Sequence, residues 1–239
     1  MEYRMPPQEK IAGIIGGMGP EATVDLMRRV IRNTPAQDDI DHVHCLVDNN
    51  PKVPSRIKAL VEGTGESPAP AMVDMARRLE KAGADFLCIA CNTAHHYYPN
   101  VREAVHIPVL NMIALAVDAA RKADPTARAF GILCTPATRT TKIYANILQE
   151  YGLEAVYPEP AVEAALLGVI KDVKKGNTGR DVKDRMAAIV RHMQDKGVVT
   201  AIAACTELGV IMEGEEYLIS VLDAAEVLAQ AIVQNAKNT

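Results

Sequence analysis

Short apolar segments alternate with amphipathic helical segments along most of this chain. The candidate strands are Ile11–Ile15, Val43–Val47, Phe86–Ala90, Val109–Asn111, Ala129–Leu133, Glu154–Val156, Ala201–Ala204 and Val221–Leu222. Between them, apolar positions recur with a helical period, most clearly over Glu21–Asn33, Ala69–Ala82, Thr140–Tyr151, Ala161–Lys175 and Gly179–Lys196. Strands that alternate with helices predict parallel sheets joined by helical crossovers. We therefore expect an α/β fold.

Three segments of the chain recur in the same order further along the sequence. Leu79–Cys91 resembles Met193–Cys205 at an offset of 114 residues, Ile107–Leu115 resembles Ile219–Val227 at 112, and Gly13–Gly16 resembles Gly131–Cys134 at 118. Such duplication predicts two similar lobes related by a pseudo-twofold axis, each a parallel sheet flanked by helices. Ligands of open parallel sheets bind beyond the carboxyl ends of the strands, so the site should be the cleft between the lobes.

Composition narrows the class of protein. The 239 residues are 49% apolar, which is enough to bury one or two cores and excludes a disordered chain. The 26 basic and 30 acidic residues give a net charge of −4 without a long block of one sign. Together with 4% aromatic residues and no Trp, this balance argues against a nucleic-acid partner.

The sequence also argues against a membrane partner. No apolar run approaches the ~18 residues that a membrane span needs. The polar start, Met1–Lys10, and the break of the next apolar stretch at Gly16-Gly17 are not typical of a signal peptide. Five cysteines, an odd number that mostly falls in strands, indicate reduced thiols and a cytoplasmic protein.

Two of the five cysteines have polar residues immediately after them in the chain. Cys45, Cys88 and Cys134 fit small buried apolar residues. Cys91 precedes Asn-Thr and Cys205 precedes Thr-Glu, at the same position of each repeat. Asn and Thr are typical helix N-cap residues, so each thiol should lie near a helix N-terminus, where thiolate is favoured. The repeat places these two thiols on opposite walls of the expected cleft.

Competing interpretations exist for two neighbouring motifs. Cys88-Ile-Ala-Cys91 has the spacing of a redox or metal motif, but no second such pair accompanies it, and His95 and His96 fit ordinary helix or loop residues. The loop Gly16–Pro20 formally satisfies a dinucleotide fingerprint. A proline at its end removes a donor for a pyrophosphate, so a tight strand–helix turn and a cradle for a small carboxylate both remain open.

Two basic residues are candidates for binding carboxylates. Arg56 ends a loop, Asn49–Arg56, that two prolines stiffen, and guanidinium matches a carboxylate bidentately. Lys174 lies near the end of a predicted helix. From composition alone, a solvated surface charge is the more common role for each.

Five motifs in order resemble one known family. They are Gly16-Gly-Met-Gly-Pro20, Asn49-Asn-Pro51 with Arg56, Cys91-Asn-Thr-Ala-His95, Gly131-x-x-x-Thr135-x-x-Thr138 and Cys205-Thr-Glu207. Together with the paired cysteines they resemble the aspartate/glutamate racemase superfamily, and within it the aspartate racemase branch. The resemblance extends from about Ile11 to about Ile232.

The resemblance implies a cofactor-independent racemase, commonly a dimer, with its site between the lobes and no metal. It implies that Cys91 and Cys205 are the acid and base. It further implies that the substrate-binding residues are Met18, Arg56, Asn92, Thr93, Thr135, Thr138, Lys174 and Thr206. The first lobe would comprise residues 1–112 and 213–239, and the second lobe residues 113–212.

The resemblance leaves the substrate open. Members of this branch often carry Asp immediately before the loop arginine, whereas Ser55 stands there in this chain. Aspartate is the expected substrate and glutamate a possible one. Hydantoin racemases, maleate isomerases and decarboxylases share the same lobes, and a non-catalytic amino-acid sensor would be a further alternative. The presence of both cysteines argues against the decarboxylases that use one.

Overall fold

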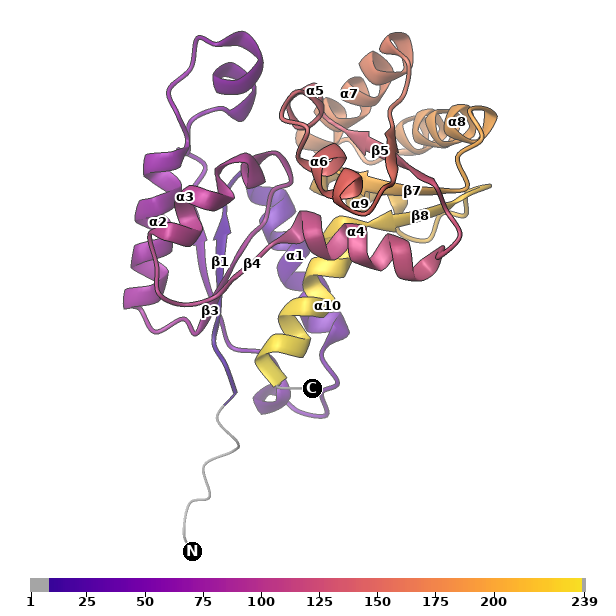
Figure 1. Cartoon of the computed structure of the whole chain (residues 1–239). Helices are drawn as coiled ribbons and strands as arrows, with labels where there is room; N and C mark the ends of the chain where they lie inside the picture. Colours follow the sequence, from indigo (N-terminus) through magenta and orange to yellow (C-terminus); the bar gives the residue numbers. More distant parts are fainter. Residues whose placement is uncertain (1–8, 238–239) are drawn as a thin grey trace, which may run out of the picture.

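The computed structural model describes residues 9–237 and consists of two α/β lobes (Figure 1). The first sheet has the strand order β2-β1-β3-β4, with β1 Ala12–Gly16, β2 Cys45–Asn49, β3 Phe86–Ile89 and β4 Val109–Leu110. The second has the order β6-β5-β7-β8, with β5 Ala129–Cys134, β6 Glu154–Val156, β7 Thr200–Ala204 and β8 Ser220–Asp223. All pairings in both sheets are parallel. The identical strand order confirms the predicted duplication and the α/β class.

Helices flank both sheets. The first half of the chain contains α1 Pro20–Asn33, α2 Ala69–Lys81, α3 Tyr98–Glu103 and α4 Met112–Ala123, with short helices η1 Asp39–Asp41, η2 Lys58–Glu62 and η3 Thr93–Tyr97. The second half contains α5 Pro136–Thr140, α6 Ile143–Glu150, α7 Pro160–Lys174, α8 Arg180–Asp195, α9 Thr206–Met212 and α10 Ala224–Lys237. None of these helices is both long and apolar enough to cross a membrane. Because both sheet faces are covered, β1, β3 and β7 are buried along their whole length.

Two predicted boundaries are wrong. The helix expected over Thr140–Tyr151 begins only at Ile143, as α6, because Lys142 adopts a left-handed conformation (φ 56°) and separates it from the short helix α5. The chain was also expected to return to the first lobe at residue 213, but β8 pairs with β7 in the second sheet. The return therefore comes with α10, which packs on α1 and α4. Most of the N-terminal segment Met1–Lys10 lies outside the described residues.

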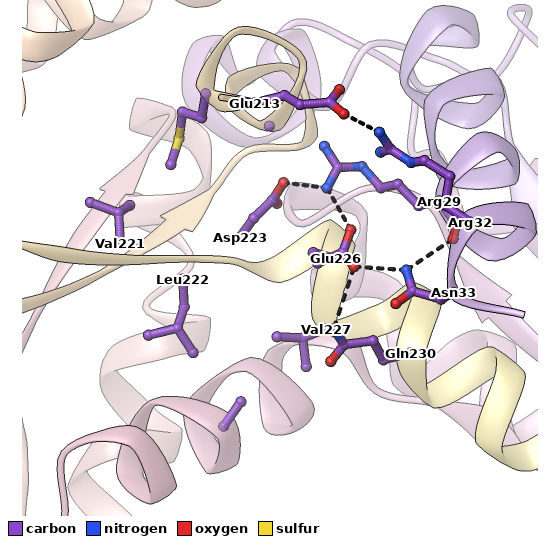
Figure 2. A pocket seen from close by; sticks show the side chains of 13 residues that line it. Arg29, Arg32, Asn33, Glu213, Val221, Leu222, Asp223, Glu226, Val227 and Gln230 are labelled. Atoms are coloured by element: carbon purple, nitrogen blue, oxygen red, sulfur yellow. Dashed lines mark hydrogen bonds and ion pairs between the residues drawn. The ribbon is translucent and has the colours of Figure 1, made fainter. Parts of the chain in front are cut away.

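The two lobes share a core and an ion-pair network. One apolar cluster contains strand residues of both sheets together with α4 and α10, which lie at the junction in Figure 1. Beside it lies a hollow of about 590 Å³. Figure 2 shows that charged side chains of its lining are paired with one another. The buried Arg29 of α1 contacts Asp223 at the end of β8 at 2.9 Å and Glu226 of α10 at 3.0 Å. These ion pairs join α1 to the segment through which the chain leaves the second sheet.

Candidate functional site

A small cavity of about 90 Å³ lies between the lobes, beyond the carboxyl ends of β1, β3, β5 and β7. Its lining comes from both lobes and consists of Met18, Ser55, Arg56, Ile57, Cys91, Asn92, Thr93, Thr135, Lys174, Cys205, Thr206 and Glu207. All residues that the sequence singled out for the site are in this set except Thr138. The two repeat-equivalent cysteines therefore border one cavity, as the duplication predicts.

Cys205 has an acidic partner. It occupies the N-cap of α9 and is 6% exposed, and its thiol donates a hydrogen bond to Glu207 Oε2 at 3.0 Å. The other carboxylate oxygen of Glu207 lies 3.3 Å from Lys174 Nζ. Burial, followed by the charge of Glu207, raises the pKa of the Cys205 thiol well above its ordinary value. This shift is opposite in direction to the one that the helix N-terminus was expected to favour.

Glu207 is a site residue that the sequence analysis missed. Its side chain is only 8% exposed and it lines the cavity between Cys205 and Lys174. The available signal was an acidic residue two positions after the second cysteine. Lys174, which was expected to bind a carboxylate, has the Glu207 carboxylate beside it, and burial offsets part of the resulting rise in its pKa.

Cys91 has a different environment. It is 7% exposed and follows β3, and the short helix η3 begins two residues later, so the predicted proximity to a helix start holds. Asn92 was expected to cap this helix, but its side chain makes no cap hydrogen bond. The residue equivalent to Glu207 is Thr93, so the first repeat places a hydroxyl where the second places a carboxylate.

His95 has a structural role beneath Cys91. Its Nδ1 lies 2.8 Å from the carbonyl oxygen of Cys91, and its Nε2 accepts from the backbone N–H of Met112 at 3.1 Å. Nδ1 is therefore the protonated nitrogen and donates to the carbonyl. Burial lowers the pKa of His95 to about 4. Both ring nitrogens are occupied, which leaves none for a metal, and no cluster of metal-ligating side chains occurs among residues 9–237.

Three threonine hydroxyls meet where the lobes join. Thr93 Oγ1 lies 3.2 Å from Thr135 Oγ1 and 2.7 Å from Thr138 Oγ1, and the latter two are 3.1 Å apart. Thr135 also caps α5, since its hydroxyl accepts from the backbone N–H of Thr138 at 3.2 Å. Thr93 and Thr135 line the cavity, whereas Thr138 does not. The hydrogen bonds of Thr138 thus hold the two lining hydroxyls in position.

The glycine loop positions Arg56. Gly17 has a φ of 86°, and a Cβ there would lie 2.2 Å from the Asn50 backbone, so the loop needs glycine to pack against the following loop. The Met18 carbonyl accepts from Arg56 Nη2 at 3.0 Å, and the Pro54 carbonyl accepts from Nη1 at 3.0 Å. No carboxylate among the described residues forms an ion pair with this guanidinium. Arg56 is thus oriented by neutral carbonyl groups and can take up an incoming carboxylate.

The sequence model of the Asp/Glu/hydantoin racemases matches residues 15–232. This chain belongs to that family. A broad specificity amino-acid racemase, RacX of Bacillus subtilis (strain 168), is 26% identical over 225 residues, which cover 92% of this chain and 96% of that protein. These relatives confirm that the protein is an isomerase of the racemase type.

Solved structures of the family agree with the fold. The aspartate racemase of Picrophilus torridus superposes with a TM-score of 0.85 at 33% identity, covering 95% of this chain and 94% of that one. A glutamate racemase from Francisella tularensis, solved with D-glutamate, superposes at 0.67 with 19% identity, covering 94% and 80%. The first of these supports the aspartate racemase branch indicated by the motifs, and the second shows the shared two-lobed fold.

Proposed function

We propose that this protein interconverts L- and D-aspartate by two-base 1,1-proton transfer, with Cys91 and Cys205 as the acid/base pair. The observation that carries the proposal is that these repeat-equivalent thiols border the same small interlobe cavity. The 33% identity to an aspartate racemase favours aspartate. Glutamate, one methylene longer, is the second substrate to test.

The proton balance of the reaction needs both cysteines. The thiolate of one removes the α-proton from one face of the substrate, and the thiol of the other delivers a proton to the opposite face. The base ends as a thiol and the acid as a thiolate, so proton exchange with solvent returns the pair to its starting state. Inversion results because the two groups approach from opposite faces.

The negative charge that develops on the substrate needs preorganised donors. Arg56, the Asn92 amide and the Thr93, Thr135 and Thr206 hydroxyls are the candidates in the cavity lining. Of the two cations, Arg56 has no carboxylate partner among the described residues, whereas Lys174 is paired with Glu207. We assign Arg56 to one substrate carboxylate. We assign Lys174 to the other, with its ammonium group shared between that carboxylate and Glu207.

The proposal includes activity without a metal or an organic cofactor, a cytoplasmic location and a homodimer. Turnover assays after chelator treatment test whether a metal is needed. Light scattering during size-exclusion chromatography tests whether the protein is a dimer. Full activity after chelation supports the two-cysteine chemistry. Activity that is lost on chelation and restored by zinc would overturn it.

The substrate is tested directly by incubation with L-aspartate, L-glutamate and several neutral amino acids in deuterated water. We expect α-deuteration together with appearance of the D-enantiomer, fastest with aspartate. Turnover of a hydantoin or of maleate instead would favour the related family activities. Binding of an amino acid without any α-deuteration would favour a sensor.

A further inference from the structure

A hydrogen bond from a residue outside the cavity lining orients the side-chain amide of Asn92. Asn92 is 2% exposed and lines the cavity. Its Oδ1 accepts a hydrogen bond from the Tyr144 hydroxyl at 2.5 Å, while its Nδ2 is buried without a hydrogen-bond partner among the described residues. A buried amide nitrogen left without an acceptor is costly, so such a group in a ligand cavity points to a ligand that accepts its hydrogen bond.

Tyr144 is itself a buried residue outside the cavity lining. It lies on α6 and is 1% exposed. The hydroxyl of Tyr144 donates its hydrogen bond to Asn92 Oδ1. Burial raises the pKa of Tyr144 well above its ordinary value, so the hydroxyl keeps its proton and remains a donor. If the amide were flipped, its nitrogen would donate to the phenol oxygen and the phenol proton would lose this acceptor.

We propose that Tyr144 is a positioning residue that holds the Asn92 amide with its NH₂ group toward the cavity, as a donor to a substrate carboxylate. The inference rests on the proposed function. With the Asn92 carbonyl occupied by Tyr144, the amide presents to the substrate a donor instead of an oxygen that would repel a carboxylate. The bond also links the lobes, because Tyr144 comes from the second and Asn92 from the first.

The test is Tyr144→Phe, which removes the hydroxyl and keeps the ring. We expect KM for aspartate, and its Kd measured by calorimetry, to rise about 5- to 20-fold, with kcat changed less than threefold. Tyr157→Phe is the matched control, because Tyr157 is a second-lobe tyrosine outside the cavity lining, and it should leave Kd unchanged. In an Asn92→Ala background, Tyr144→Phe should have no further effect on Kd.

Two results would overturn the inference. They are an unchanged Kd in Tyr144→Phe, whether or not the melting temperature falls, and an equal rise of Kd in the Asn92→Ala background. Asn92→Asp provides a second route if Tyr144→Phe fails to fold, since it replaces the donor by an acceptor and should weaken aspartate binding more than tenfold. Wild-type affinity in Asn92→Asp would contradict the inference. Failure of the wild-type protein to bind or racemise aspartate would instead reject the proposed function.

Discussion

The thiol of Cys205 donates a hydrogen bond to the carboxylate of Glu207, whereas Cys91, its counterpart in the first repeat, has Thr93 at the position of that acid. The duplicated fold therefore presents two unlike thiols to one cavity. Burial and the charge of Glu207 raise the pKa of Cys205, which favours the thiol form of this cysteine over the thiolate. We infer that Cys205 is the proton donor in the resting enzyme and that Glu207 is the group that sets this state.

Replacing Glu207 by Gln should lower the pKa of Cys205, because it removes the negative charge and leaves the Lys174 ammonium beside the thiol. A neighbouring charge typically moves a pKa by ~1–3 units. The pH profile of iodoacetamide labelling at Cys205, read by peptide mass spectrometry, should shift to lower pH.

Glu215→Gln is the control for this variant, because Glu215 pairs with Arg180 and Lys183 and does not line the cavity. It should leave the labelling profile of Cys205 unchanged. An unshifted Cys205 profile in Glu207→Gln would mean that burial alone sets the pKa of this thiol.

Replacing Arg56 or Lys174 by Met should raise KM for aspartate more than KM for a neutral amino acid. Loss of one partner from a desolvated charge pair typically costs ~2–5 kcal/mol, which is more than tenfold in affinity, and solvent screening should make the loss smaller for Lys174, whose side chain is 43% exposed. The effect should be larger for Arg56, since Lys174 already has the Glu207 carboxylate beside it. Steady-state kinetics with both substrates measures the difference. Equal small effects on KM for all substrates would show that both residues are solvated surface charges that do not bind the substrate.

His95 should make the protein less stable in acid. The unfolded chain binds a proton at this residue below pH ~6.5, whereas the folded protein does so only below about pH 4. The unfolded state thus holds more protons between these values, and the free energy of unfolding falls as pH falls. The loss should reach roughly 3 kcal/mol below pH 4.

His95→Gln removes the titrating group and keeps a side chain that can donate to the Cys91 carbonyl and accept from Met112. Urea unfolding at several pH values should give a shallower acid dependence for this variant than for the wild type. Parallel curves for the two proteins would show that other groups cause the acid sensitivity.

Much of the fold could be predicted because it depends on local patterns. Predicted strands such as Ile11–Ile15 and Ala201–Ala204 are apolar throughout, as buried parallel strands require, and each predicted strand overlaps an observed one. The recurrence of Leu79–Cys91 as Met193–Cys205 predicted that β3 and β7 are equivalent. The start of α6 at Ile143 was missed because no Gly marks the left-handed Lys142 before it.

The cavity could be predicted only in part, because its electrostatics depend on contacts between distant elements. The motifs indicated nine residues that do line it, yet Glu207 and Tyr144 were not among the candidates. Sequence spacing places Glu207 near Cys205 but does not show that α7 brings Lys174 to the other carboxylate oxygen. The helix-start argument correctly indicated where Cys205 lies, but not the direction of its pKa shift, which burial and the charge of Glu207 raise.

The central claim is that Cys91 and Cys205 serve opposite faces of one substrate, and α-deuterium wash-in with single cysteine variants tests it most directly. Cys91→Ala and Cys205→Ala should each stop racemisation in both directions, because each direction needs both groups. The remaining cysteine can still exchange the α-proton of the enantiomer that it faces through its thiolate form, which the raised pKa of Cys205 makes scarce in Cys91→Ala. General acid–base groups contribute ~10²–10⁴-fold, so this exchange should be slow but measurable.

The measurement is therefore mass-spectrometric α-deuteration of separate L- and D-aspartate by both single variants and by the double variant. We predict that the two single variants label opposite enantiomers and that the double variant labels neither. Racemisation at a near-native rate by either single variant, or labelling of the same enantiomer by both, would contradict the two-base account.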